Sequence, residues 1–485
     1  MHTKKLLVLL LTALLLATSC GNAGTAETET TPTADTSPVE TETAETEIPD
    51  GLPEMDLEGY TYRMSINGND ERRAQTYVEE LNGEIINDAV YNKMIAVEER
   101  FNTEITMAEL INTDDKLESI KNSIIAGDDA FDIVQGHDIT MAQYSMQGLY
   151  YDLYDVPYLD FSKPWWPAAT TESMTVAGQM YMMFNNISYN NLASTRIMFF
   201  NKDMMTDMGL EFPYQQVYEG TWTLDSMQVM VDQGYVDTNG NGEKDLSDKF
   251  GYISPNYFYA VMEPFRLEPY QKDADGNLYY NFDLDKMMTL TEKYYALLFG
   301  NGGYVNVNVD DNTYDVFTQG NAMFMYASFS YAIMKFSYGD VVFGVLPMPK
   351  LDEQQDGYYG GSTDRPIAIP ITAAANLDKI GLITEALNAE GYKQVFPAYY
   401  ETAMKSRYAD QTDDAAMMEL IHDNTIISFT YLFGEYKSAY NIMFEDLFVK
   451  NSPGTDVASW AAKNESSQIA HLEKLQAFFD ENKDE

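Results

Sequence analysis

The stretch from Asp237 to Asp248, DTNGNGEKDLSD, carries oxygen-bearing side chains at the alternating positions of a calcium-binding loop. In the pattern D-x-N-x-N-G-x5-D, these oxygens wrap one hard cation, and the central glycine permits the sharp turn. The expected ligands are Asp237, Asn239, Asn241, the backbone carbonyl of Glu243, Asp245 and Asp248. Asp248 closes the loop at the position where a longer glutamate is usual, and we expect this shorter side chain to weaken the affinity for calcium. The spacing predicts a structural Ca²⁺, and a solvated polar turn is the alternative interpretation.

The histidines and serines form no catalytic pattern. His137, His422 and His471 have no metal-binding spacing, and the chain contains no H-E-x-x-H, G-x-S-x-G or phosphate-loop motif. Paired carboxylates for glycoside hydrolysis cannot be judged in so acidic a chain, because it offers too many candidates. We therefore expect a protein that is not an enzyme, with a calcium-stabilised secreted glycan hydrolase as one alternative.

The residues that would hold a ligand must be positioned by the alternating elements that begin at Tyr60. Residues 60–66 alternate apolar and polar side chains as a strand does, and apolar residues within 85–101 recur at the helical spacing of about 3.6. A strand at 104–107, a helix over 114–127 and a short strand at 131–134 follow. This order predicts an α/β sheet, most simply parallel, whose ligands bind beyond the carboxyl ends of the strands.

The first residues have the pattern of a secretory signal. Lys4 and Lys5 precede an apolar run over 6–17, which is shorter than the roughly 20 residues that a membrane-spanning helix needs. The sequence LLATSC-GN resembles a bacterial lipobox, although Ala17 replaces the usual leucine. We therefore expect a signal peptide over 1–19 and lipidation of Cys20, the only cysteine, with a simple secreted protein as the alternative.

The residues after Cys20 form a Thr-, Glu- and Pro-rich stretch over 20–56 that has almost nothing apolar to bury, which predicts a disordered tether. The whole chain of 485 residues has a formal net charge of −46, because 30 basic residues face 76 acidic ones. Such a charge excludes nucleic acid as a partner and leaves the lipid anchor as the only contact with a membrane. The expected location is extracytoplasmic, on the outer face of the cell membrane.

Several strings occur in an order that resembles a known family. These are AGDDAFDIV at 126–134, DFSKPWW at 160–166, VAGQMYMM at 176–183, FFNKDMMTDMGLEFP at 199–213 followed by GTWTLDSMQ, FTQGNAMFMYAS at 317–328 and the later FGVLPMPKLDEQQDGYYG. In this order they resemble the extracellular solute-binding proteins of sugar-type ABC importers. The resemblance implies a two-lobed, periplasmic-binding-protein-like α/β fold (type II), in which each lobe is a mixed sheet flanked by helices and hinge strands join the lobes.

From this resemblance we expect lobe 1 at 57–188 and 327–397, and lobe 2 at 189–326 and 398–485, with a C-terminal helix on the surface of one lobe. The function implied is capture of a carbohydrate or oligosaccharide, or less readily a peptide, by hinge closure. The expected partners are the solute and the ABC permease subunits, and the protein is expected to be a monomer. A surface glycan adhesin without a transporter is a further alternative.

Candidate ligand-binding residues follow from the topology, because polar and aromatic side chains near strand ends and crossing segments suit sugar hydroxyls and ring faces. The candidates are Asn67, Asn69, Asp70, His137, Asp138, Asn185, Asn186, Tyr189, Tyr257, Tyr259, Ser328, Phe329 and Tyr331. Asn185 and Phe329 are expected to face solvent when the lobes are open. The 36 tyrosines also favour a carbohydrate receptor, although most of these rings must lie in the core.

Overall fold

The computed structural model describes residues 48–108, 116–255, 261–305, 312–363, 365–405, 412–434, 446–450 and 456–483. By their contacts, Asp50–Glu485 form one unit, separate from Met1–Pro49. The predicted signal peptide, Cys20 and most of the predicted tether lie outside the described residues. Within the described residues, no helix combines the length and apolar character needed to cross a bilayer.

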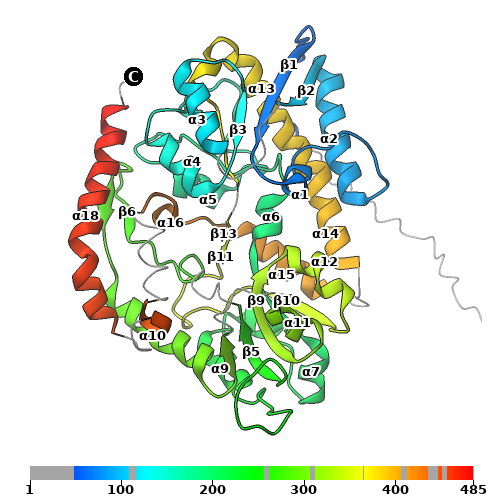
Figure 1. Cartoon of the computed structure of the whole chain (residues 1–485), viewed down its shortest axis with the longest axis vertical. Helices are drawn as coiled ribbons and strands as arrows, with labels where there is room; N and C mark the ends of the chain where they lie inside the picture. The colour runs from blue at the N-terminus through cyan, green and yellow to red at the C-terminus, as the bar shows by residue number, and fades with distance from the viewer. Residues whose placement is uncertain are drawn as a thin grey trace, which may run out of the picture. The chain divides into compact units, whose positions relative to one another are not determined.

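The first sheet has four strands in the order β12-β3-β1-β2. Its strands are β1 (Tyr60–Ile66), β2 (Thr103–Met107), β3 (Ile133–Gln135) and β12 (Ile367–Ala368). β1 pairs in parallel with both β2 and β3, and β12 is antiparallel to β3. Helices α2 (Ile85–Phe101) and α3 (Lys116–Ala126) connect the three parallel strands, so the predicted alternation of strand and helix is confirmed (Figure 1).

The second sheet has five strands in the order β10-β4-β9-β5-β8. Its strands are β4 (Arg196–Asn201), β5 (Phe250–Ser254), β8 (Gly303–Val305), β9 (Ala322–Ser328) and β10 (Phe343–Leu346). β5 is parallel to β8 and β9, whereas β4 is antiparallel to both β9 and β10. β10 therefore runs in the same direction as β9, and four of the five strands end at one edge of the sheet.

Each sheet lies in its own hydrophobic core, which gives the two lobes of the fold. The first core contains Tyr62, Met64, Val97 and Phe101 together with Trp165 and Trp166. The second contains Phe199, Trp222, Tyr252, Phe324 and Met325. The middle strands of the second sheet are apolar along nearly their whole length, as expected for strands covered on both faces.

Shorter elements complete the first half of the chain. They are α1 (Asp70–Ala74), α4 (Asp138–Ser145), the 3-10 turn at Leu153–Asp155, α5 (Ala168–Met174), α6 (Asn190–Ser194), α7 (Lys202–Asp207), α8 (Tyr214–Glu219) and α9 (Leu224–Val231). The second half adds β6 (Tyr270–Lys272), β7 (Leu278–Tyr280), α10 (Leu284–Phe299), α11 (Asn312–Thr318), α12 (Ser330–Met334), β11 (Gly360–Gly361), α13 (Leu377–Glu390), α14 (Phe396–Lys405), α15 (Thr412–Asp423), β13 (Thr425–Ile426), α16 (Phe429–Phe433) and α18 (Val457–Glu481). Short 3-10 turns at Phe336–Tyr338 and Ile371–Asn376 and π-helical turns at Gly391–Val395 and Asp446–Lys450 also occur.

The distribution of chain segments between the two cores differs from the expected division in several places. Phe429 of α16 belongs to the first core, although residues 398–485 were expected in lobe 2. β10 pairs with β4 in the second sheet, although residues 327–397 were expected in lobe 1. Tyr270 and Leu278 of the β6–β7 hairpin belong to the first core, although they lie within 189–326. α18 contributes Trp460 to the second core and Leu472 to the first, so the C-terminal helix is not confined to one lobe. Pairing and burial, which depend on partners far along the chain, determine these placements.

Candidate functional site

The carboxyl edges of the two sheets are connected by the segment from Gly360 to Ala368. At its beginning, a side chain added at Gly360 would lie 3.8 Å from the carbonyl oxygen of Arg196, the residue that starts β4 beside the end of β9. At its end, Ile367 pairs with Gln135 at the end of β3. Nine residues of chain therefore link the edges at which α/β sheets bind ligands, and this region is the candidate site.

Polar side chains gather at the carboxyl edge of the first sheet. Arg365 Nη1 donates hydrogen bonds to the backbone oxygen of Asn67 at 2.5 Å and to Asn67 Oδ1 at 3.1 Å. Gln135 Nε2 donates to the backbone oxygen of Arg365 at 3.2 Å, and Gln135 Oε1 accepts from the Thr76 hydroxyl at 2.9 Å. Of these, the sequence predicted Asn67, whereas Thr76, Gln135 and Arg365 were missed.

His137 and Asp138 lie side by side at the same edge, as their positions after β3 predict. His137 Nδ1 is 3.2 Å from Asp138 Oδ1, and the His137 side chain is 56% exposed. Asp138 is buried, and burial raises the pKa of its carboxyl group although His137 and Arg365 oppose this shift. The pair thus presents one imidazole to solvent beside a buried carboxyl group.

Asn69 and Asp70 have local roles at the start of α1. The side chain of Asn69 accepts a hydrogen bond from the backbone nitrogen of Arg72 at 3.0 Å, which is an N-cap. Asp70 lies 3.3 Å from Arg73 Nη1, and its side chain is 97% exposed.

The crossing segment places Asn185 and Asn186 inside the protein. Asn185 is completely buried, and its Oδ1 accepts from the backbone nitrogens of Ile187 and Ser188. Asn186 Nδ2 donates to the backbone oxygen of Trp165 at 2.9 Å. Tyr189 packs against Tyr399 with ring centroids 5.2 Å apart. These contacts hold the crossing segment in place. Asn185 was expected to face solvent, whereas in the structure its side chain is buried.

The residues after β9 are also mostly internal. Phe329 is completely buried, and its ring contacts Tyr399 with centroids 5.6 Å apart, which differs from the expected solvent-facing position. Tyr331 stacks on Tyr314 with centroids 3.9 Å apart. Ser328 is half-buried and pairs in register with Arg196 at the carboxyl edge. Tyr257 and Tyr259 lie outside the described residues.

A second polar group at the edge of the second sheet was not predicted. A side chain added at Gly361 would lie 3.0 Å from Glu263 Oε2. Burial raises the pKa of the Glu263 carboxyl group, and nearby Arg196 opposes this shift. The buried hydroxyl group of Tyr326 lies near this carboxyl group and the Arg196 guanidinium group, and Tyr252 lies near Tyr326. Burial raises the pKa of Tyr252 to about 12. These residues come from four separate segments, so no spacing in the sequence could reveal the group.

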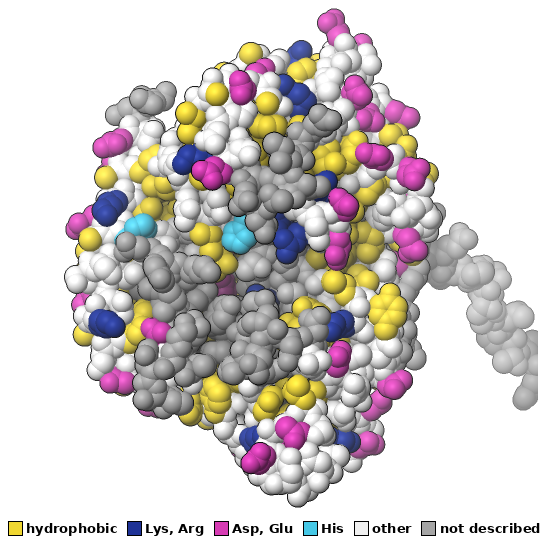
Figure 2. All heavy atoms as spheres, in the orientation of Figure 1, with side chains coloured by type: hydrophobic (Ala, Val, Ile, Leu, Met, Phe, Trp, Pro, Cys, Tyr) yellow, Lys and Arg dark blue, Asp and Glu magenta, His cyan; other side chains and the backbone are white. Residues whose placement is uncertain are grey.

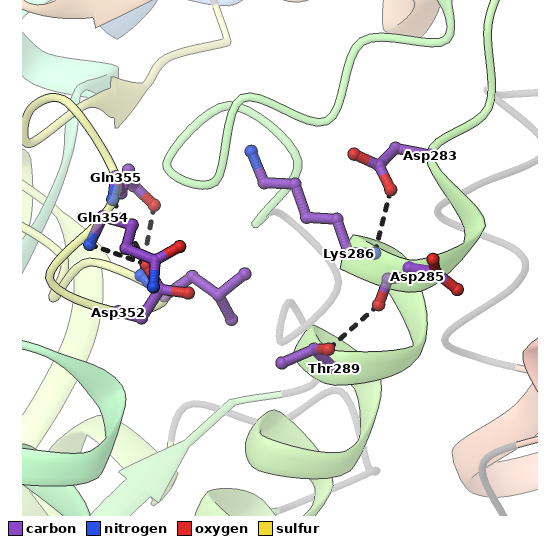
Figure 3. Close-up of a pocket in the computed structure, with 8 residues that line it drawn as sticks. Asp283, Asp285, Lys286, Thr289, Asp352, Gln354 and Gln355 are labelled. Carbon is purple, nitrogen blue, oxygen red and sulfur yellow. Dashed lines mark hydrogen bonds between the residues drawn. The ribbon is translucent and has the colours of Figure 1, made fainter.

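A pocket of about 370 Å³ opens beside the first turn of α10 (Figure 3). α10 packs along β8 and leads into its amino end, so the helix begins at the carboxyl edge of the second sheet. Figure 3 shows Lys286 extending from the helix toward the loop of Gln354 and Gln355. A neighbouring hollow of about 190 Å³ shares Asp283 and Lys286. Burial lowers the pKa of Lys286. The lining of the larger pocket comes from the second lobe alone, so we regard this pocket as peripheral to the region of Gly360–Ala368.

The predicted calcium loop is folded on hydrogen bonds of its own. Asp237 accepts from the backbone nitrogens of Gly240 at 2.7 Å and Gly242 at 2.9 Å. The side-chain nitrogens of Asn239 and Asn241 donate to Asp245 Oδ2, while Glu243 is exposed. Asp248 is completely buried and accepts from the backbone nitrogens of Thr238 and Asp245. Among the residues with described positions, no three His, Cys, Asp or Glu side chains group closely enough to hold a metal ion. Calcium binding therefore stays a prediction.

Comparison with known proteins identifies the fold. No family model and no curated protein matches the sequence. A sugar transporter from Rhizobium etli in an open conformation aligns with a TM-score of 0.57 at 14% identity, covering 86% of this chain and 99% of that one. The GacH receptor of Streptomyces glaucescens, solved unliganded and with acarbose, aligns with a TM-score of 0.54 at 13% identity over 85% and 99% of the chains. The maltose/maltodextrin-binding domain MalE of Bdellovibrio bacteriovorus, bound to maltotriose, gives 0.54 at 13% over 84% and 100%. The chain has the two-lobed, periplasmic-binding-protein-like α/β fold of these proteins.

Proposed function

We propose that this chain, which has the two-lobed fold of sugar-type solute-binding proteins, captures a carbohydrate outside the cytoplasm and delivers it to the permease of an ABC importer. The observation that carries the proposal is the short segment Gly360–Ala368, which connects the carboxyl edges of the two sheets. Around it lie amides, carboxyl groups, guanidinium groups and an exposed imidazole, which are groups that hydrogen-bond hydroxyls.

The chemical class of the ligand is supported by the structural neighbours. The receptor from Streptomyces glaucescens was solved with acarbose and the domain from Bdellovibrio bacteriovorus with maltotriose. An oligosaccharide bound here would contact both lobes and stabilise their closed arrangement, which the permease would recognise. A dissociation constant near micromolar, worth roughly −8 kcal/mol, would allow both capture and release.

In this proposal the protein binds its ligand and releases it chemically unchanged. Two lobes with separate cores support a receptor rather than a glycan hydrolase built on one barrel. An adhesin would share the binding step, but it would need no permease. Uptake of a bound sugar by cells that contain the chain, and loss of this uptake when the chain is deleted, would separate import from adhesion.

Anchoring through Cys20 and a calcium ion at Asp237–Asp248 complete the proposal. The signal pattern, the single cysteine and the Thr- and Glu-rich tether support a lipoprotein held at the outer face of the cell membrane. The oxygen-bearing residues at alternating positions support the calcium ion.

The test is calorimetric titration of the protein with a panel of oligosaccharides and peptides, followed by solution scattering and chromatography of the ligand. We expect saturable binding of an oligosaccharide, a smaller radius of gyration and an unchanged ligand. His137→Ala should weaken binding without lowering stability, because the side chain is 56% exposed. Tyr338→Ala is the matched control, since Tyr338 is 83% exposed in the chain that leads to the opposite end of β10. Turnover of the ligand, or no binding across the panel, would contradict the proposal.

A further inference from the structure

Two guanidinium groups flank the turn that ends β1. Arg73 Nε donates a hydrogen bond to the backbone oxygen of Gly68 at 3.0 Å. Arg365 Nη1 donates to both oxygens of Asn67, the residue before this glycine. The two arginines come from α1 and from the segment that connects the sheets, and they hold adjacent residues of one turn. The Asn67–Gly68 turn, as we name this feature, therefore lies in a locally positive environment.

The same turn has buried hydrogen-bond donors without acceptors. Asn67 is only 4% exposed, and its Nδ2 has no partner among the described residues. Arg73 Nη2 is likewise buried and without an acceptor in the described part of the chain. A buried donor left unpaired destabilises the folded state, so two such donors at one turn require an explanation. Both are N–H groups, and the group that would satisfy them must supply acceptor oxygens.

Two acidic side chains among the described residues lie close to these arginines. Asp70 approaches Arg73 through Nη1, but its carboxylate is 97% exposed and therefore well screened by water. Asp138 is buried, and burial raises the pKa of its carboxyl group although His137 and Arg365 oppose this shift. The surroundings contrast with the chain as a whole, whose net charge is −46, and with the acidic side chains spread over the face shown in Figure 2.

The turn borders solvent, although its two unpaired N–H groups are themselves buried. Gly68 is half-buried, whereas Asn69 and Asp70 are exposed. Gly68 has φ +141°, and a side chain added there would lie 2.9 Å from Arg72 Cβ and 3.5 Å from Arg365 Nη1. A side chain at this position would collide with Arg72, so glycine allows the backbone of the turn to pack closely against the arginines.

We propose that the Asn67–Gly68 turn binds the anionic oxygen group, a carboxylate or a sulfate, of an acidic sugar. This inference rests on the proposed function and specifies its substrate class. A carboxylate or sulfate offers several acceptor oxygens, which match the unpaired N–H groups of Asn67 and Arg73, and the forked guanidinium group binds such anions in a defined geometry.

The experiment compares three probes by calorimetric titration of the protein: a trimer of galacturonic acid, a sulfated disaccharide and neutral maltotriose. At least one acidic probe should bind about tenfold or more tightly than maltotriose, and this advantage should shrink as salt is raised. The acidic probe that binds more tightly than maltotriose identifies the anion as carboxylate or sulfate. Equal or tighter binding of maltotriose would overturn the inference while leaving sugar capture intact. No binding of any sugar would instead overturn the proposed function together with this inference.

Variants assign the effect to the turn. Arg73→Gln should abolish the preference for the acidic probe, whereas Arg73→Lys should retain part of it, because lysine keeps the charge but not the fork. Lys121→Gln, on α3 of the same lobe, removes one positive charge elsewhere and should retain the full preference. If Arg73→Gln melts below the assay temperature, the Arg73→Lys variant and the comparison of probes on the parent protein still decide the outcome. A preference that survives equally in all variants would overturn the inference.

Discussion

The indole nitrogen of Trp165 donates a hydrogen bond of 2.8 Å to Oε1 of Glu385, which lies 220 residues further along the chain. Trp166 donates to Oε2 of the same carboxyl group at 2.9 Å. The segment that carries the two tryptophans also holds Asn186 through the backbone oxygen of Trp165. One buried carboxyl group on α13 therefore organises the chain that leads out of the first lobe.

Glu385→Gln should destabilise the protein by about 1–3 kcal/mol, because an amide offers one acceptor oxygen where two indoles need two, and leaves a buried N–H group unpaired. Urea unfolding monitored by tryptophan fluorescence would measure the loss. Glu473→Gln, at an exposed position of α18, is the control that should change the unfolding free energy by less than about 0.5 kcal/mol. Equal stability of the two variants would contradict the assigned role of Glu385.

Glu385 should also give the protein a distinct dependence of stability on pH. Burial raises the pKa of its carboxyl group from the ordinary 4.5 to about 7. The folded state therefore binds more protons than the unfolded state between these values, and this contribution to stability decreases as pH rises from about 4.5 to about 7. The difference in unfolding free energy between parent and Glu385→Gln, measured across this range, should show that decrease. A difference that does not change with pH would contradict it.

Lys93 should give the stability of the protein the opposite dependence on pH, in a higher pH range. Its ammonium group is completely buried, donates to the backbone oxygens of Thr76 and Ile187, and has a pKa lowered by burial from 10.5 to about 7. The unfolded state binds more protons between these values, so this contribution to stability should increase as pH rises from about 7 to about 10.5. Lys93→Met should lack this increase in equilibrium unfolding. A variant with the same slope as the parent would show that Lys93 titrates normally.

Phe329→Ala should cost roughly 3–5 kcal/mol of stability, because removing a buried aromatic ring leaves a cavity. The site of the change lies where β9 leaves the second sheet, and Phe329 packs on Tyr399 of α14. Thermal unfolding would measure the loss, with the exposed Tyr338→Ala as the comparison. A melting temperature near that of the parent would show that the ring faces solvent, as the sequence suggested.

Calcium should raise the melting temperature if the Asp237–Asp248 loop binds it. At a free concentration about 100 times the dissociation constant, binding stabilises the folded state by roughly 2.7 kcal/mol. Asp237→Ala should abolish the response to calcium. Asp248→Ala should destabilise the protein even in chelator, because Asp248 is buried and accepts two backbone hydrogen bonds. A melting curve of the parent that is identical with calcium and with excess chelator would remove the ion from the proposal.

Cys20→Ala should release the protein from the cell surface into the medium, because cysteine is the residue that a lipobox lipidates. Fractionation of cells and medium with an antibody to the chain measures this distribution. Ser19→Ala, the neighbouring substitution, should leave the protein membrane-bound. Retention of Cys20→Ala in the membrane fraction would contradict lipid anchoring.

The sequence by itself determined the local elements of the first lobe. The apolar spacing within Ile85–Phe101 predicted α2 at its observed bounds, and the order of strands and helices predicted a parallel arrangement of β1, β2 and β3. These features depend on side-chain periodicity, which neighbouring residues express directly. The sequence also placed Asn67 and His137 after their strands, because a position in a strand can be counted along the chain.

Only the tertiary structure decided which of these residues meet one another. Arg365 lies 298 residues from Asn67, and nothing in the spacing of either predicts their hydrogen bond. β10 joined the second sheet, and Asn185 and Phe329 became buried, because partners distant in sequence cover them. Pairing and burial depend on the whole packed chain, whereas periodicity depends on a few consecutive residues. For that reason the elements could be predicted from the sequence, while the Asn67–Gly68 turn with its two arginines could not.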